Sequence, residues 1–331
     1  MATTIKDVAK YAGVGVGTVS RVLNGGKSVN EKTSQRVLDA IKALNFVPNK
    51  MASRLRTDES GLLALLVPVV NHPFFAKFAY FVEDEADKYG YSILLVSSQR
   101  RIHKEDEILR RIRRREIDGA IFVTHFEHSE KDLEGFPLVS IDRSLGKNVP
   151  YVTSDNYEAT AKAVEYLLSC GCKKVGYVGS KPLTNSEVLK REEAYRAVME
   201  KYGMPLRIKN DVILHGDERD VVSAFLDEFP DVDGVFASGY SMSQVLYETA
   251  QQRGMEIPED LQIVSYDGAF RQWNNNRLLT CVEQPIEEMA RTVVKLLIAK
   301  INGEELPERT MLNTSFIIGA TTKKIKNDKE S

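Results

Sequence analysis

The chain has 331 residues, 43% hydrophobic and 28% charged, a composition typical of a globular protein with two or three domains. It has no apolar run near the roughly 18 residues of a membrane span, no signal-peptide stretch and only three cysteines, so we expect a cytoplasmic protein without membrane segments. The net charge of −2 conceals an asymmetry, because residues 1–58 carry ten Lys and Arg against four Asp and Glu, and this basic end predicts a polyanionic partner.

The first segment of the chain predicts two short helices joined by a tight turn. Thr4 can cap the first helix, and Asp7 adds negative charge to its first turn. Residues 12–14 (Ala-Gly-Val) suit the turn, and a second helix is expected over residues 16–23 with Val19 on its inner side. Its other side presents short or polar groups that suit the edge of a major groove, namely Val16, Gly17, Thr18, Ser20 and Arg21. This spacing predicts a helix-turn-helix that binds DNA.

The letters D-V-A, A-G-V, T-V-S-R-V and N within residues 7–24 resemble the headpiece of the lactose/galactose-repressor family of bacterial transcription regulators. The resemblance continues in residues 46–55 and, more loosely, to about residue 320. It implies that Val16, Gly17 and Arg21 face the base edges, where the Arg21 guanidinium can bond guanine O6 and N7. It also implies phosphate contacts, which position the protein without reading sequence, from Thr4, Thr18, Asn24 and Asn49.

A third helix is expected to complete a headpiece over residues 1–48. Asn30 can cap this helix, and one of its faces carries the apolar residues Val37, Leu38, Ile41 and Leu44. Residues 49–60 then form a hinge and linker, with good helix propensity over a stretch too short to be helical alone in water.

The family resemblance makes residues 49–57 a hinge helix that orders when two copies pack against each other in the minor groove. It places Ala52 and Leu55 there, with Leu55 as the wedge that unstacks a base step. The alternative is an ordinary packing role for Leu55 on a short helix. Because one helix-turn-helix buries little area, we expect a homodimer on a pseudo-palindromic operator in double-stranded DNA.

From residue 62 onward, apolar runs alternate with amphipathic stretches. The expected strands are 62–70, 91–97, 119–123, 138–141, 175–178, 212–214, 234–236 and 262–266. Helices are expected near 75–89, 104–115, 157–170, 187–202, 218–229, 241–254 and 286–301. Continuous apolar strands that alternate with helices predict an α/β fold with parallel sheets covered on both faces.

Two such units fit an effector-binding and dimerisation core over residues 61–322. One subdomain is expected to hold about 61–155 and 286–314, and the other about 156–284 and 315–322. Residues 323–331 are polar and are expected to be a disordered tail. The pattern resembles the periplasmic sugar-binding-protein fold that the repressor family shares.

A ligand crevice is expected where the carboxyl ends of the two parallel sheets meet. Residues that resemble the sugar-binding positions of the family follow these strands, namely Phe74, Phe75, Asp142, Arg143, Arg191 and Asp267. For the two phenylalanines the alternative is a core position, and for the Asp-Arg pair it is a surface ion pair. The resemblance, which is nearest to the sucrose- and ribose-operon repressors, implies a sugar or sugar-phosphate effector.

One departure from the family falls in this crevice. Relatives usually carry an Asn-Asp or Asp-Asp pair where this chain has Gly239 and Tyr240. The loss of a carboxylate removes a charge-assisted acceptor, and Tyr240 is expected to fill part of the pocket. Trp273 is a further candidate for stacking on the ligand, with a packed loop tryptophan as the alternative.

A dense basic run lies on the helix expected near 104–115, with arginines at 110, 111, 113, 114 and 115. A phosphoprotein co-effector or phosphorylated metabolite is one partner for this run. A solvated helix face paired with Glu105, Asp106 and Glu107 is the favoured interpretation.

The sequence shows no catalytic motif and no cofactor fingerprint, and its histidines have no metal-like spacing except His125-x-x-His128 in an expected loop, so we expect a sensor and not an enzyme. The alternative is a sugar-binding or sugar-modifying protein with an incidental basic N-terminus. Whether a ligand induces or co-represses does not follow from the sequence, because both use the same parts.

Overall fold

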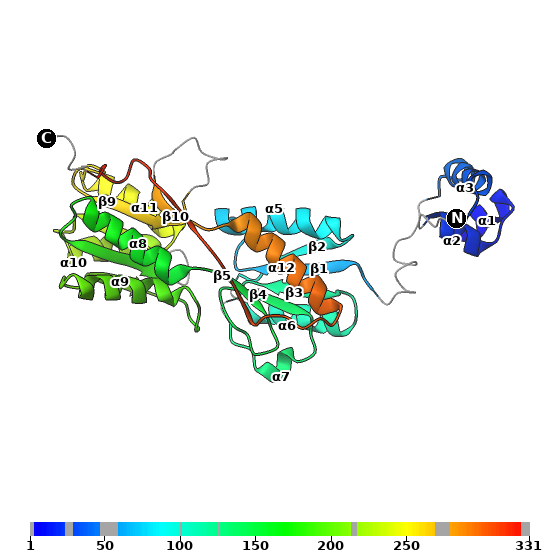
Figure 1. Cartoon of the computed structure of the whole chain (residues 1–331), viewed down its shortest axis with the longest axis horizontal. Helices are drawn as coiled ribbons and strands as arrows, with labels where there is room; N and C mark the ends of the chain where they lie inside the picture. The colour runs from blue at the N-terminus through cyan, green and yellow to red at the C-terminus, as the bar shows by residue number, and fades with distance from the viewer. Residues whose placement is uncertain are drawn as a thin grey trace. The chain divides into compact units, whose positions relative to one another are not determined.

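The computed structural model describes residues 3–23, 29–46, 59–99, 101–124, 126–212, 217–268 and 279–325. The chain divides into two compact units, residues 1–60 and residues 61–331 (Figure 1). The site predictions that lie outside the described residues are Asn24, Asn49, Ala52, Leu55 and Trp273.

The first unit contains the helices α1 (Ile5–Ala12), α2 (Val16–Leu23) and α3 (Glu31–Ala43). The Thr4 backbone N–H and hydroxyl donate to the Asp7 carboxylate at 2.8 and 2.7 Å, and these bonds hold the pKa of Asp7 below its usual value. The Asn30 side chain accepts the N–H of Thr33 at 2.8 Å. Both predicted helix starts are therefore confirmed, each by a short polar side chain at the N-terminus of a helix.

The core of the first unit consists of the buried residues Val8, Ala9, Ala12, Val19, Val37 and Ala40. The prediction that Leu38 lies on the inner face of α3 is wrong, because its side chain is 50% exposed. The inner face of α3 consists of residues 37, 40, 41 and 44. Successive residues of a helix are about 100° apart around its axis, so Leu38 points away from the face that contains Val37.

The second unit contains two six-stranded sheets. The first has the order β11-β5-β4-β3-β1-β2, with all strands parallel. Its strands are β1 (Leu62–Val67), β2 (Ser92–Ser97), β3 (Gly119–Phe122), β4 (Leu138–Ile141), β5 (Tyr151–Ser154) and β11 (Arg309–Leu312). The helices of this subdomain are α5 (Pro73–Lys88), α6 (Ile102–Arg113), α7 (Glu130–Leu133) and α12 (Ile286–Ile301).

Alternation along β1 shows how this sheet is covered. Leu63 and Leu65 pack in one core with α5 and α12, which lie side by side in Figure 1, whereas Ala64 and Leu66 pack with α6 on the opposite face. Residues 63–67 are fully buried, as expected for a central parallel strand.

The second sheet has the order β12-β10-β9-β8-β6-β7, and only β12 runs antiparallel to its neighbour. Its strands are β6 (Val175–Ser180), β7 (Ile208–Asp211), β8 (Gly234–Ala237), β9 (Gln262–Tyr266), β10 (Thr280–Glu283) and β12 (Ser315–Ile317). The helices α8 (Asn156–Ser169) and α9 (Leu189–Lys201) cover one face, and α10 (Glu218–Glu228) and α11 (Tyr240–Gln252) cover the other.

The chain passes between the two sheets three times, from β5 to α8, from β10 to α12 and from β11 to β12. The predicted α/β class is confirmed. The strand predicted at 212–214 lies mostly outside the described residues. The strand found just before it is β7, whose half-exposed polar sequence Ile-Lys-Asn-Asp pairs with β6 through its backbone. An edge strand of this kind carries no apolar run to reveal it. Within the described residues, no helix is long and apolar enough to cross a membrane.

Gly119 lies where β3 passes closest to α12. A Cβ atom there would lie 2.9 Å from the Leu297 side chain and 2.9 Å from the backbone oxygen of Pro137. We expect Gly119→Ala to lower the free energy of unfolding in urea by about 1–3 kcal/mol. Gly239→Ala is the matched control, since nothing lies within 4 Å of its Cβ position and its φ of −171° is extended. Equal stability of the two variants would contradict this account of the packing.

Candidate functional site

Helix α2 presents its predicted base-reading residues to solvent. Val19 is completely buried and fixes the inner side of the helix, while Val16, Gly17 and Arg21 are exposed. Thr4 is exposed and Thr18 is half-buried. A short helix with one buried side and an exposed side of small groups and one arginine can enter a major groove.

The turn before α2 depends on Gly13. Its φ of 64° is left-handed, and this conformation lets the N–H of Val14 donate to the carbonyl of Ala9 at 3.0 Å, which ends α1. The first turn of α2 carries no acidic side chain. The start of α2 can therefore present the positive end of the helix dipole to a phosphate without a competing carboxylate.

A second candidate site is a cavity of about 340 Å³ in residues 61–331, lined by both subdomains. From the first subdomain it is lined by the ends of β1, β3 and β4 and the start of α5, and from the second by the ends of β6, β8 and β9 and the start of α11. The volume suits a small molecule such as a monosaccharide.

Two carboxylates occupy equivalent places at the ends of strands in the two sheets. Asp142 follows β4 and Asp267 follows β9, and each strand is third in its sheet when counted from β11 or β12. Both residues have left-handed φ angles, 58° and 62°, and their N–H groups donate to Val152 and Val282 in the neighbouring strands. Such a conformation is uncommon outside glycine, although aspartate adopts it more readily than most residues, and it clusters at functional sites.

The two carboxylates are fixed by polar neighbours. The Thr153 hydroxyl donates to Asp142 Oδ1 at 2.7 Å, and Gln284 Nε2 donates to both oxygens of Asp267 at 3.0 and 3.1 Å. Thr153 and Gln284 are both buried. The carboxylates therefore keep one orientation toward the cavity without a ligand.

Arg191 of α9 lines the same cavity, and its charge acts on both carboxylates. Its Nε donates to Asn156 Oδ1 and its Nη1 to the carbonyl of Ser238, both at 2.7 Å. The guanidinium also lies 3.4 Å from the centre of the Tyr266 ring. A buried guanidinium held in this way is a rigid donor, and together with two acceptors it can bond several hydroxyl groups of one ligand.

Burial raises the pKa of Asp142 and raises that of Asp267 to about 6, while the positive charge of Arg191 opposes both shifts. A carboxylate that is costly to ionise but kept in a cavity is typical of a functional site. The carboxylates, Gln284 and Arg191 donate and accept hydrogen bonds, which suits the binding of a polar ligand.

An aromatic wall faces these polar groups. His72 lies 5.2 Å from Phe75 and meets Tyr240 of the other subdomain edge-on at 6.2 Å. Burial lowers the pKa of His72, which favours its neutral form. Because Nδ1 accepts the N–H of Phe74, the neutral ring carries its proton on Nε2. Phe74 also stacks on Phe78 in the core, which leaves Phe75 as the half-buried ring of the pair.

Arg143 lies outside the lining of the cavity. Its Nη1 donates to the carbonyl of Phe126 at 2.7 Å and to the Thr184 hydroxyl at 2.6 Å. The predicted cavity residues that the structure brings together are Phe74, Phe75, Asp142, Arg191, Tyr240 and Asp267. Sequence reasoning missed Gln284, Thr153 and His72, although a QPI motif and an NHPFF loop contain two of them.

The arginine run of α6 is partly paired. Arg110 bonds Glu107, and Arg111 bonds Glu116. The expected pairing with Glu105 is wrong, because this residue is completely buried and bonds Thr124 and His128. A phosphoprotein partner at this run stays a prediction. Among the described residues, no three His, Cys, Asp or Glu side chains form a group that could hold a metal.

Two family models match the chain. Residues 4–49 match "Bacterial regulatory proteins, lacI family", and residues 164–322 match a periplasmic binding protein-like domain. The ribose operon repressor of Halalkalibacterium halodurans is 37% identical, and that of Bacillus subtilis is 31% identical. These alignments cover 97% of this chain and 97% and 99% of the respective relatives.

Solved structures agree with the fold. The Lac repressor dimer bound to operator and an anti-inducer has a TM-score of 0.85 over 97% of this chain and 99% of that one, at 19% identity. A CelR–cellobiose complex has a TM-score of 0.69 over 96% and 99%, at 27% identity. A helix-turn-helix unit joined to a two-subdomain core with a ligand cleft defines a DNA-binding transcriptional regulator. The chain belongs to the lacI family of bacterial regulatory proteins.

Proposed function

We propose that this protein is a homodimeric repressor of a carbohydrate uptake or catabolism operon and acts in the cytoplasm. A sugar bound between the core subdomains controls its affinity for a pseudo-palindromic operator. The observation that carries the proposal is the cleft, where Arg191, Asp142 and Asp267 line one cavity together with His72, Phe75 and Tyr240. Sugar hydroxyls donate to carboxylates and accept from guanidinium groups, and sugar ring faces pack on aromatic rings.

D-ribose is the first effector to test, because ribose operon repressors are 37% and 31% identical to nearly the whole chain. The charges of the cavity favour a neutral sugar over a phosphorylated one. The lining has three carboxylates, Asp142, Glu218 and Asp267, and two cations, Arg191 and Lys181. The Arg191 guanidinium already bonds Asn156 and Ser238. A phosphate dianion would meet more negative than positive charge.

On the DNA side, Val16, Gly17 and Arg21 read base edges from a headpiece of residues 1–48, while Thr4, Thr18, Asn24 and Asn49 contact phosphates. The hinge and linker at 49–60 place Ala52 and Leu55 in the minor groove. Sugar binding changes operator affinity to the extent that it favours one arrangement of the core over another. A hundredfold change in operator binding needs about 2.7 kcal/mol of coupling.

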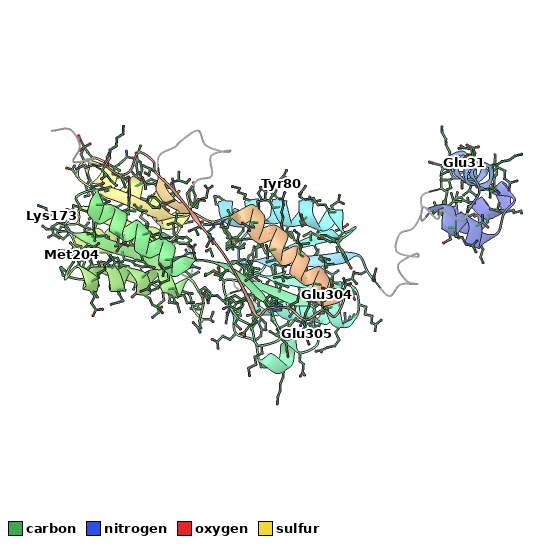
Figure 2. All side chains as sticks on the ribbon, in the orientation of Figure 1. Glu31, Tyr80, Lys173, Met204, Glu304 and Glu305 are labelled. Atoms are coloured by element: carbon green, nitrogen blue, oxygen red, sulfur yellow. The ribbon has the colours of Figure 1, made fainter. Side chains whose placement is uncertain are left out.

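The first sheet supports dimer formation through the core of residues 61–322. β2 is an edge strand whose Leu95 is 44% exposed, and Tyr80 on the neighbouring helix α5 is 67% exposed and points outward in Figure 2. An apolar edge strand with free backbone groups is stabilised when another chain covers it.

The proposal is tested by selecting duplexes from a random pool with the purified full-length protein at physiological salt. We expect a pseudo-palindromic consensus whose affinity changes at least about tenfold when D-ribose is added, in either direction, and less with ribose 5-phosphate. No preference for any palindromic duplex over scrambled DNA would contradict the DNA-binding part, and no response to any neutral sugar would contradict the effector part.

The rival interpretation, a sugar-modifying protein with an incidental basic N-terminus, makes a different prediction. A chain without residues 1–60 would then keep its turnover of the sugar. Under our proposal the shortened chain binds the sugar unchanged, turns none over and has no operator affinity.

A further inference from the structure

Three residues in the segment 184–187 of the second subdomain, Thr184, Ser186 and Glu187, bond to the first subdomain across the cleft, and we call this segment the strap. The strap lies between β6 and α9. The Thr184 hydroxyl accepts from Arg143 Nη1 at 2.6 Å. The Ser186 hydroxyl and the Glu187 N–H both donate to the backbone oxygen of Asp142, at 2.9 and 2.8 Å.

The Glu187 side chain adds two more bonds to the first subdomain. Its carboxylate accepts from the Tyr151 hydroxyl at 3.1 Å and from Arg309 Nη2 at 2.9 Å, and Lys190 of its own subdomain completes the set at 2.6 Å. The Glu187 side chain is only 11% exposed. The bond to Tyr151 is partly buried, and the side chains of Arg309 and Lys190 are 38% and 37% exposed. Hydrogen bonds to a charged carboxylate are stronger than those between neutral groups.

The strap bonds to only one of the two aspartates that occupy equivalent places in the cleft, so the backbone oxygens of Asp142 and Asp267 have different partners. The backbone oxygen of Asp267 accepts from the Ser265 hydroxyl, within its own subdomain. The backbone oxygen of Asp142 accepts from Ser186 and Glu187 of the other subdomain. Both aspartates hold a left-handed φ, which persists only where neighbouring groups enforce it. The bonds of the Asp142 backbone oxygen therefore depend on the closed arrangement of the cleft, whereas that of the Asp267 backbone oxygen does not. Asp267 is linked to the first subdomain indirectly, through Gln284 and Tyr266, which both bond Ser154.

We propose that the strap is a positioning element, through which Ser186 and Glu187 set the conformation of Asp142 only when the two subdomains are closed. This inference rests on the proposed function, in which Asp142 binds the effector sugar. Closure of the two subdomains then also orients the Asp142 carboxylate toward the sugar. The affinity for sugar is therefore proportional to the fraction of the protein that is closed. The bonds of Glu187 stabilise that closed fraction before any ligand is present.

The test compares two full-length variants that each remove one negative charge. Glu187→Gln keeps the backbone N–H of the strap but loses the charged bonds to Tyr151 and Arg309. Glu192→Gln is the control, because Glu192 bonds Arg196 and Asn210, both in its own subdomain. In calorimetric titration with D-ribose, we expect the dissociation constant to rise about tenfold for Glu187→Gln and to stay at the wild-type value for the control.

Amide hydrogen exchange, measured without sugar, is a second test. A merely structural role of Glu187 would not produce the pattern of exchange that we expect. We expect faster exchange over residues 142–145 in Glu187→Gln, with residues 265–268 around the equivalent Asp267 unchanged. Equal exchange at 142–145 in both variants, or equal ribose affinity in both, would overturn the strap. If wild-type protein binds no ribose, the effector assignment fails while the exchange experiment still decides the role of the strap.

Discussion

Replacement of Arg21 by alanine is expected to lower operator affinity by about 10- to 100-fold and to remove most of the preference for operator over scrambled DNA. Arg21 is exposed in the last turn of α2, whose opposite side is fixed by the fully buried Val19. A guanidinium on the exposed side of this helix can make two hydrogen bonds to one guanine, and alanine can make neither of them. Fluorescence anisotropy with both duplexes at one fixed salt concentration measures the ratio.

Arg36→Ala is the matched control, since Arg36 is also an exposed arginine of the headpiece and lies on α3. It removes the same charge, so a general electrostatic effect would weaken both variants alike and on both duplexes. Circular dichroism should show the same helix content and melting for the two variants. An unchanged operator-to-scrambled ratio in Arg21→Ala would refute its role in base reading.

Local chemistry made much of this fold predictable. The starts of α1 and α3 followed from Thr4 and Asn30, whose side chains satisfy N–H groups within four residues of themselves. The central strands followed from apolar runs that are buried on both sides. Where an element depends on distant parts of the chain, the sequence pattern failed: β7 is polar and half-exposed, and its conformation depends on pairing with β6.

The cleft divides in the same way. Asp142 and Asp267 were predictable because they resemble sugar-binding positions of the family and follow parallel strands, whose carboxyl ends meet at one edge of a sheet. Gln284 was not predicted as a site residue. It comes within hydrogen-bond distance of Asp267 because the chain crosses between the subdomains at this point. The strap could not be predicted for a similar reason. Glu187 lies in a polar loop, and its partners Tyr151 and Arg309 come close to it only when both subdomains are folded.

Replacement of Asp267 by asparagine is expected to stabilise the protein at pH 7 while it removes the response to sugar. Burial raises the pKa of Asp267 from 3.8 to about 6, so the folded chain holds this proton more tightly than the unfolded chain. Stability from this group therefore falls as the pH rises from about 4 to about 6, and above that the ionised carboxylate is a constant cost. Asparagine avoids that cost, and we expect a gain of about 1–3 kcal/mol in the free energy of unfolding at pH 7 that vanishes toward pH 4.

Sugar binding should respond in the opposite sense. Wild-type affinity for D-ribose is expected to fall as the pH is lowered through about 6, because the protonated carboxyl loses acceptor capacity for hydroxyl groups. Asp267→Asn should bind about 10- to 100-fold more weakly at pH 7 and lose most of this pH dependence, with operator affinity unchanged. Asp227→Asn, at an exposed position of α10, should leave both properties at the wild-type values. A variant that is destabilised yet still responds to sugar would contradict the assignment, because Asp267 would then be a structural residue and the ligand would be held elsewhere.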